Sequence, residues 1–405
     1  MMKNKEGIAQ FSRSDFLKIM TDRIKAVSAA PNAPVSDLYA HAPNKLALAL
    51  HPPVQFLVVR EVIEHNPDMK SFLLAPDTAK GTASLAWFSA GQYIVVSLNV
   101  NGKTVCRPYS IASSPRDTKS GTLRITVKRV ADGVASGYML DNWTAGTEVI
   151  ASAPLGDFTY EPLRDAKAVI GIAGGSGITP FRAFAKAIAE GDEDFSLTLL
   201  YGSRTMADAV FSDEFAAWEK ACSKIRLVNV LSEETTDGCE HGFITADLIQ
   251  KYAPQDEAYS IFLCGPQAMY DFADKEIATL GIRRKFVRHE LFGEYFHPER
   301  NADYPGDITK TYRLTVTVAG KTQTIDCPAD TSLLRAMEAA GIAAPSDCRS
   351  GRCGWCRSQL LEGEVYVPQS VDGRRLADKL YGYVHPCCAF PLSDVAIDVP
   401  PMPFH

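Results

Sequence analysis

Three cysteines near the C-terminal end of the chain stand at a spacing that suits a metal site. Cys348, Cys353 and Cys356 lie in the stretch "CRSGRCGWC", five and then three positions apart. Cysteines this close together can ligate a metal, form disulfides or act as small buried apolar side chains. The N-terminal residues hold no apolar run typical of a signal peptide, so we expect a cytoplasmic chain whose thiols stay reduced. This expectation favours metal over disulfides.

The spacing narrows the choice of metal centre. Cys-x4-Cys-x2-Cys followed by a distant thiolate is the spacing of plant-type [2Fe-2S] centres, and "VHPCCAF" supplies Cys387 and Cys388. Zinc is the main rival, but structural zinc sites usually take two separated ligand pairs, whereas three ligands crowd one loop here. A Rieske centre needs two Cys and two His ligands, and "CEH" at residues 239–241 has no second pair to match it. We therefore interpret the loop as a [2Fe-2S] site.

A glycine-rich loop in the middle of the chain could bind a nucleotide. "GIAGGSGITPF" runs from an apolar, strand-like segment into a helix that we expect to begin near Thr179. Gly174, Gly175 and Gly177, with Ser176 among them, let the backbone approach a pyrophosphate, and the helix dipole favours the anion. The spacing is neither G-x-G-x-x-G nor a P-loop, so the loop by itself fits an ordinary turn equally well.

Composition limits the remaining function classes. The 405 residues predict two or three domains, and 46% apolar with 22% charged residues is ordinary for a soluble globular protein. A net charge of -6 argues against a nucleic-acid surface, which needs clustered Lys and Arg. No window approaches the ~18 uninterrupted apolar residues of a membrane helix. We therefore expect neither nucleic acid nor a membrane span among the interactions of this chain.

The order of strand-like and helix-like segments divides the chain into a leader and three domains. In the leader, residues 1–52, we expect a helix over 14–27 with Ser14 as N-cap, packed on the main body, followed by a linker. Residues 53–163 read as short strands broken by turns, which predicts an antiparallel β-barrel. Residues 164–300 alternate strand and helix, which predicts an α/β domain with a parallel sheet. Residues 301–405 begin with a linker and continue as an α+β domain: a hairpin over 312–328, a helix over 331–340 and the cysteine loop.

The C-terminal domain resembles plant-type ferredoxins, which have the β-grasp fold, over nearly its whole length. The ending "GYVHPCCAFPLSDVAIDV" carries the family's Gly-Tyr-Val pattern two residues before a ligand cysteine. This register implies that Cys387 is the fourth ligand and Cys388 its neighbour. Three arginines share the cluster loop, Arg349, Arg352 and Arg357. They could raise the cluster's potential and meet an acidic partner, or they could simply be solvated.

The barrel region carries a motif that resembles the flavin site of the ferredoxin-NADP reductase superfamily. "RPYS" comprises Arg107, Pro108, Tyr109 and Ser110 and is expected to follow a strand. The resemblance implies that the Arg reaches a phosphate, the ring stacks on the isoalloxazine and the Ser hydroxyl lies near flavin N5. These residue types suit the tasks: a bidentate cation, a flat π surface and a short hydroxyl.

Further motifs of the same superfamily follow in order. "ITVKRVADGVASGYML" implies a flavin pyrophosphate site, and hence FAD rather than FMN, with the candidate residues Val127, Lys128, Gly133 and Ser136. The segments "YGSR", "CGP" and "HELF" imply positions near the adenosine ribose, the nicotinamide and the flavin. Their candidate residues are Gly202, Ser203, Arg204, Cys264, Gly265, Pro266, Glu290 and Phe292. With these motifs, "GGSG" and Thr179 become the expected NAD(P) loop.

Over residues ~53–405 the chain resembles electron-transfer reductases of the phenylacetyl-CoA oxygenase reductase and ketosteroid hydroxylase reductase kind. The resemblance implies hydride transfer from NADH or NADPH to FAD, then single-electron steps through the [2Fe-2S] cluster to a protein acceptor such as a terminal oxygenase. In this mechanism Ser110 steadies flavin N5, Cys264 and Thr179 orient the nicotinamide, and Glu290 lies near the flavin. Two alternatives remain: a small-molecule acceptor such as a quinone or oxygen, or an iron-sulfur sensor without turnover.

Overall fold

The computed structural model describes residues 13–29, 41–131, 133–290 and 293–402, and the chain forms two compact units, residues 1–49 and 50–405. The first unit holds helix α1 (Arg13–Ala29) and most of α2 (Ala42–Leu50). The helix predicted over 14–27 is therefore confirmed. Ser14 is not its N-cap, because Arg13 is already helical. Leu17, Met20 and Ile24 are exposed within this unit, and their packing on the main body stays a prediction.

The second unit begins with an antiparallel sheet whose strand order is β4-β3-β6-β1-β2-β5. Its six strands are β1 (Val54–Asn66), β2 (Met69–Pro76), β3 (Tyr93–Val100), β4 (Lys103–Ser110), β5 (Leu123–Lys128) and β6 (Glu148–Ser152). Alternate residues of β1 such as Leu57 and Val59 are buried, as expected for a half-buried strand. Helix α3 (Val134–Asn142) joins this core through Met139 and Leu140. The predicted antiparallel barrel architecture is confirmed as a half-barrel.

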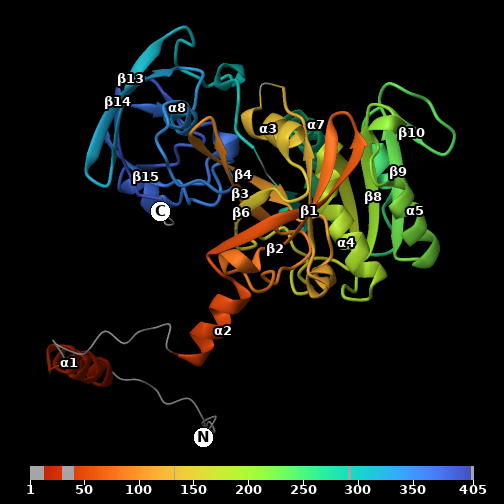
Figure 1. Cartoon of the computed structure of the whole chain (residues 1–405), viewed down its shortest axis with the longest axis horizontal. Coiled ribbons are helices and arrows are strands. Elements are labelled where there is room, and N and C mark those ends of the chain that lie inside the picture. Colours follow the sequence, from red (N-terminus) through yellow and green to blue (C-terminus); the bar gives the residue numbers. More distant parts are fainter. Residues whose placement is uncertain (1–12, 30–40, 132, 291–292, 403–405) are drawn as a thin grey trace, which may run out of the picture. The chain divides into compact units, whose positions relative to one another are not determined.

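A parallel sheet follows, with the strand order β10-β9-β8-β7-β11-β12. Its strands are β7 (Ala168–Gly174), β8 (Ser196–Ser203), β9 (Ile225–Leu231), β10 (Glu240–His241), β11 (Tyr259–Cys264) and β12 (Val287–Glu290). Strands β8, β9 and β10 lie next to one another in Figure 1. Every residue of β7 is buried, because helices cover both faces of the sheet. One apolar core includes α4 (Thr179–Ala189) and α5 (Ser212–Ala221), and the other includes α6 (Ala246–Tyr252) and α7 (Gln267–Thr279).

The C-terminal part is a mixed sheet packed on one helix. The strands β13 (Thr311–Val318), β14 (Lys321–Pro328), β15 (Ser358–Glu362), β17 (Tyr383–Val384) and β19 (Val395–Val399) lie in the order β14-β13-β19-β15-β17. Strands β13 and β19 are parallel, and α8 (Leu333–Ala339) packs beneath them through Leu333 and Met337. A second, two-stranded sheet pairs β16 (Val365–Tyr366) with β18 (Phe390–Pro391), and α9 (Leu376–Leu380) completes the domain. This is the α+β arrangement predicted for residues 301–405.

Short 3-10 helices connect the elements of the second unit. They are η2 (Thr78–Lys80), η3 (Pro115–Ser120), η4 (Gly175–Ile178), η5 (Met206–Asp208), η6 (Arg284–Phe286), η7 (Pro298–Arg300) and η8 (Gln369–Val371). In the described parts of the chain, no helix is both long enough and apolar enough to cross a membrane.

Candidate functional site

The "RPYS" motif forms the C-terminal half of β4 rather than following a strand, because its backbone pairs with β3 up to Ser110. Ser110 is buried opposite Tyr93, while Pro108 and Tyr109 are partly exposed. Burial raises the pKa of Tyr109 above its ordinary value, so this ring stays neutral. The strand thus presents a short hydroxyl and a neutral aromatic ring side by side at the end of its pairing with β3.

The second flavin motif lies where β5 ends and α3 begins. Lys128 closes β5, and Val127 is buried within this strand. The Ser136 hydroxyl accepts a hydrogen bond from the backbone N–H of Val130 at 3.1 Å, which folds the loop against the helix. A Cβ at Gly133 would lie 2.8 Å from that hydroxyl and 2.9 Å from the Val130 carbonyl, so only glycine fits. The result is a tight loop at a helix N-terminus, a geometry that suits a phosphate.

The glycine-rich loop forms η4 between β7 and α4 and packs against the end of β11. A Cβ at Gly177 would lie 2.0 Å from the Cys264 carbonyl oxygen, so the "GGSG" and "CGP" segments touch through their backbones. Gly175 has φ +54, and a Cβ there would lie 3.2 Å from the Lys128 ammonium. A cation from the first sheet therefore lies next to the glycine-rich loop of the second, an arrangement that suits an anion.

One tyrosine that the sequence analysis did not single out connects the "CGP" loop to Glu290. The hydroxyl of Tyr270, on α7, accepts a hydrogen bond from the Gly265 backbone N–H at 3.0 Å and donates one to the Glu290 carbonyl. Pro266 is the N-cap of the same helix, and the Thr179 hydroxyl donates to the Ser176 carbonyl at 2.9 Å. The only sequence signal for Tyr270 is its place one turn after "CGP" in a helix. This position in the sequence does not predict the hydrogen bonds that the Tyr270 hydroxyl forms with Gly265 and Glu290.

Two buried groups with raised pKa values lie at the neighbouring ends of β11 and β12. Burial, followed by the nearby Glu290 charge, raises the pKa of the Cys264 thiol well above its ordinary value. Burial and then the charge of Asp157 raise the pKa of Glu290 in the same way. Cys264 and Glu290 are direct neighbours in the pairing of β11 with β12. Burial therefore favours the uncharged thiol and the uncharged carboxyl at these two neighbouring strand ends.

The predicted ribose segment lies at the end of β8. Gly202 and Ser203 are its last residues, and Arg204 follows as an exposed side chain whose Nε lies 3.6 Å from an oxygen of Asp208. Glu234 accepts a hydrogen bond from the backbone N–H of Met206 at 3.0 Å. Two carboxylates, Asp208 and Glu234, and the Arg204 guanidinium therefore lie beside the end of β8.

The cysteine thiols lie in two pairs in the described structure. The sulfurs of Cys356 and Cys387 are 3.4 Å apart. The Cys348 sulfur accepts the backbone N–H of Cys353 at 3.4 Å, and a hydrogen bond with the Cys353 thiol lowers the pKa of Cys348 to about 5. Cys388 is buried and points its thiol at the His385 carbonyl, 3.5 Å away. Two pairs of thiols suit two irons with two thiolate ligands each, so the residues fit a [2Fe-2S] cluster, and the geometry favours Cys387 over Cys388.

The thiols differ in exposure. Cys348, Cys356 and Cys387 are buried, whereas Cys353 is exposed, and Trp355 beside it has 47% of its surface exposed. In the described residues, no three His, Cys, Asp or Glu side chains converge as a site for a single ion. The cysteine loop therefore has a buried side and an open side.

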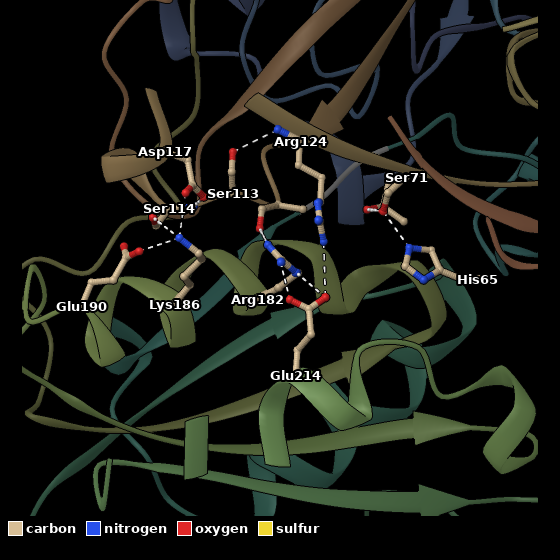
Figure 2. A network of polar contacts seen from close by, with 12 residues as sticks. His65, Ser71, Ser113, Ser114, Asp117, Arg124, Arg182, Lys186, Glu190 and Glu214 are labelled. Atoms are coloured by element: carbon tan, nitrogen blue, oxygen red, sulfur yellow. Dashed lines mark hydrogen bonds and ion pairs between the residues drawn. The ribbon is translucent and has the colours of Figure 1, made fainter. Parts of the chain in front are cut away.

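A buried arginine fixes the parallel-sheet domain against the loop that follows "RPYS" (Figure 2). Arg182, on α4, is 4% exposed and donates to the Ala112 carbonyl. Its guanidinium also pairs with Glu214 of α5, which accepts a further hydrogen bond from Arg124 of β5 at 3.3 Å. No motif marks Arg182, so the sequence analysis missed it.

A second cation of α4 extends this network toward η3. The Lys186 ammonium lies 2.7 Å from an Asp117 oxygen and 3.2 Å from the Ser114 hydroxyl, and it also pairs with Glu190 (Figure 2). The helix that begins at the glycine-rich loop is thus held at two points by segments next to the flavin motif.

The structure brings Lys128 and the "GGSG" and "CGP" segments together in one place, and the four predicted ligand cysteines in another. Phe292 lies outside the described residues, so its predicted place near the flavin stays a prediction. Arg107, predicted to reach a phosphate, has its guanidinium against the carboxylate of Glu338, at 3.0 and 3.2 Å.

Family models match all three domains. Residues 57–160 match an oxidoreductase FAD-binding domain, 172–275 an oxidoreductase NAD-binding domain and 316–392 a 2Fe-2S iron-sulfur cluster binding domain. The crystal structure of phthalate dioxygenase reductase aligns with a TM-score of 0.59 and 25% identity, over 85% of this chain and 98% of that chain. The predicted domain order and cofactors, FAD, NAD(P)H and [2Fe-2S], are confirmed.

Curated relatives match over nearly their whole length. The ferredoxin reductase component of 3-ketosteroid-9-alpha-monooxygenase from Mycolicibacterium smegmatis is 31% identical, covering 84% of this chain and 94% of the relative. One of the subunits of 1,2-phenylacetyl-CoA epoxidase from Escherichia coli is 30% identical, over 77% and 88%. The glycine betaine monooxygenase reductase subunit of Chromohalobacter salexigens is 26% identical, over 84% and 93%. The chain belongs to the family of ferredoxin reductase components with FAD-binding, NAD-binding and 2Fe-2S domains, and it is an NAD(P)H-dependent electron-transfer oxidoreductase.

Proposed function

We propose that this chain is the reductase component of a terminal oxygenase, to which it delivers electrons taken from NADH. The observation that carries the proposal is the full-length similarity to proteins whose names place them in monooxygenase or epoxidase systems. The open side of the cysteine loop supports it, because exposed Cys353 and Trp355 give a protein acceptor access to the cluster edge.

The cysteine geometry supports a definite ligand set. We assign Cys348 and Cys353 to one iron and Cys356 and Cys387 to the other, following the two pairs of thiols. Cys388 directs its thiol to a backbone carbonyl and is left as a buried neighbour. Backbone N–H groups of Ser350 and Cys353 donate to the Cys348 sulfur at 3.4 Å, which stabilises the thiolate form that binds metal.

The flavin and nicotinamide roles follow the geometry of the loops. When bound, FAD accepts a hydride from NAD(P)H and releases electrons singly to the cluster. We propose that Tyr109 stacks against the flavin ring and that Ser110 donates a hydrogen bond to its reactive nitrogen. We propose that the side chains of Thr179 and Cys264 lie next to the nicotinamide. Glu290 lies beside Cys264 at the end of β12, and burial raises the pKa of its carboxyl.

The phosphates have their own candidate donors in this proposal. Lys128 and the backbone of Gly175 lie together at the nucleotide loop, and the α3 N-terminus beside Gly133 and Ser136 receives the flavin pyrophosphate. The Arg107 guanidinium, on β4, would also contact a phosphate of the flavin.

Electrostatics at the end of β8 favour NADH over NADPH. Arg204 directly follows the last residues of β8, and an oxygen of Asp208 lies 3.6 Å from its Nε. The Glu234 carboxylate lies in the same region, where it accepts a hydrogen bond from the backbone N–H of Met206. A carboxylate hydrogen-bonds ribose hydroxyls well and repels a 2′-phosphate, as in NAD-specific sites. We also propose a cytoplasmic location, where NADH is present and an iron-sulfur centre with reduced thiols is stable.

The test separates the acceptor classes. The purified, cofactor-loaded chain is mixed anaerobically with NADH and then with one of three acceptors: a terminal oxygenase component from the same organism, a water-soluble quinone, or cytochrome c. Rapid reoxidation by the oxygenase, with substrate-dependent product when oxygen is added, is the expected result. Fast turnover with the quinone and none with the oxygenase would instead assign a small-molecule acceptor. Failure to oxidise NADH with any acceptor would indicate a sensor.

A further inference from the structure

A cluster of five charged side chains joins the flavin strand, the cysteine loop and the segment between them. We call it the interdomain ion cluster, and its members are Arg107, Glu294, Arg335, Glu338 and Arg349. Arg107 belongs to "RPYS" on β4, and Arg349 follows the first cysteine of the cluster loop. Glu338 and Arg335 come from α8, and Glu294 lies just after β12.

Glu338 is the centre of this arrangement. Its carboxylate pairs with Arg107 at 3.0 and 3.2 Å and with Arg349 at 2.7 and 2.8 Å. One carboxylate therefore holds two guanidiniums, one from the flavin domain and one from the ferredoxin domain. Glu294 repeats this bridge: it pairs with Arg349, with Arg335 at 3.2 Å and with Arg107 at 3.5 Å.

The core of the cluster is buried, unlike a typical surface salt bridge. The Arg349 side chain is 0% exposed, Glu294 8% and Glu338 13%. Burial opposes the charge of Glu294, but Arg349 and Arg107 outweigh it and hold the pKa of this carboxyl below its ordinary value. Arg349 also has φ +57, a conformation that non-glycine residues rarely adopt. The interpretation of the loop arginines as solvated is therefore wrong for Arg349, although Arg352 and Arg357 are exposed.

A neighbouring contact supports the same interface. The ammonium of Lys103, at the start of β4, donates to the carbonyl of Ala339 at the end of α8. A cation at the C-terminal end of a helix also interacts favourably with the helix dipole. Strand β4 is thus attached to α8 at two points, Lys103 and Arg107.

We propose that Glu338 and Glu294 are positioning residues that hold the cysteine loop against the flavin strand and so set the path for electron transfer from flavin to cluster. Three guanidiniums face two carboxylates, so the interdomain ion cluster keeps a net positive charge next to the flavin strand. The proposal concerns transfer within the chain and does not depend on which acceptor finally takes the electrons.

The experiment compares three glutamate variants of the full, cofactor-loaded chain. Glu338→Gln and Glu294→Gln each remove one bridging charge at nearly constant volume. Glu362→Gln is the matched control, because Glu362 is an exposed glutamate on β15 of the same domain. Flash reduction of the flavin, without NADH, measures the first-order transfer rate to the cluster. Hydrogen exchange of β4 and α8 reports on the interface itself.

We expect transfer to slow about tenfold or more in both bridging variants, since displacements of about 1 Å at a reacting centre have effects of that size or larger. Exchange in α8 should rise, while the rate of flavin reduction by NADH and the spectrum of the cluster stay as in the parent chain. The control should match the parent in every measurement.

Unchanged transfer and exchange in both bridging variants would overturn the proposal. So would a Glu338→Gln chain that loses FAD while Glu294→Gln transfers electrons normally, because Glu338 would then serve flavin retention alone. If Glu338→Gln does not fold, Glu294→Gln decides the matter by the same two measurements.

Discussion

Arg182 provides the sharpest test of how the NAD-binding and FAD-binding domains are held together. It is a buried arginine on α4 that donates to the Ala112 carbonyl, pairs with Glu214 and lies over the rings of Phe211 and Trp218 at 5.2 and 5.5 Å. Arg182→Gln keeps a polar side chain but removes the charge and the fork of donors. All of these contacts are weakened by one substitution.

The expected loss of stability can be built from these contacts. Breaking a fully buried ion pair by removing one partner costs about 3–5 kcal/mol. The loss here should be smaller, because Glu214 is 37% exposed and keeps its hydrogen bond to Arg124. The lost hydrogen bond to the Ala112 carbonyl adds about 1.5–3 kcal/mol, and the two ring contacts contribute less. We expect Arg182→Gln to lower the free energy of unfolding by about 2–4 kcal/mol, since the glutamine amide recovers part of the hydrogen bonding.

The assay is urea unfolding followed by far-UV circular dichroism, together with the rate of flavin reduction by NADH. Arg116→Gln is the matched control, because Arg116 also pairs across the two domains, with Asp192, but at an exposed position. We expect no measurable change in the control and slower flavin reduction in Arg182→Gln. Equal stability and equal rates in the two variants would refute the idea that burial makes this network hold the domains.

Three further predictions concern the sites themselves. Cys387→Ser should abolish the visible absorption of the cluster and lower the bound iron by about half or more. Cys388→Ser should leave the cluster absorption and the iron content unchanged. Ser110→Ala should slow flavin reduction at least several-fold while FAD stays bound, and unchanged stopped-flow rates would count against a role for its hydroxyl. Burial raises the pKa of Glu290, so the folded state keeps a proton that the unfolded chain releases above about pH 4.3. The free energy of unfolding should therefore fall as pH rises from there toward the folded-state pKa, and Glu290→Gln should remove that part of the slope.

The sequence was sufficient for the fold class, because the types of secondary structure and their order depend on local patterns. Short strands broken by turns over residues 53–163, and strands alternating with helices over residues 164–300, distinguish an antiparallel from a parallel sheet in the sequence alone. The close approaches at Gly133 and Gly177 require glycine, so the motifs are visible as glycine positions. The exact end of β4 was missed, because the pairing partner of Ser110 is Tyr93, a residue distant in sequence.

Tyr270, Arg182 and Glu338 could not be found in the same way. Tyr270 joins Gly265 to Glu290 across two strand ends, and Glu338 joins residues from two domains. Each is an ordinary helical residue by local pattern, and its partners are fixed only by the tertiary fold. An isolated Arg or Glu on a helix is most often a solvated side chain, so sequence reasoning assigns it no role.

The two buried arginines have a common logic that links them to the cofactor motifs. Arg182 lies three residues after Thr179 at the nucleotide loop, and Arg349 directly follows Cys348 in the cysteine loop. Each therefore links one redox site to the flavin domain. Arg182 donates a hydrogen bond to the Ala112 carbonyl, and Arg349 shares the Glu338 carboxylate with Arg107. Hydride and electron transfer depend steeply on distance, and apolar contact alone allows two surfaces to slide. Directional charge-assisted hydrogen bonds restrict that sliding, which explains why buried charges stand beside both loops despite their desolvation cost.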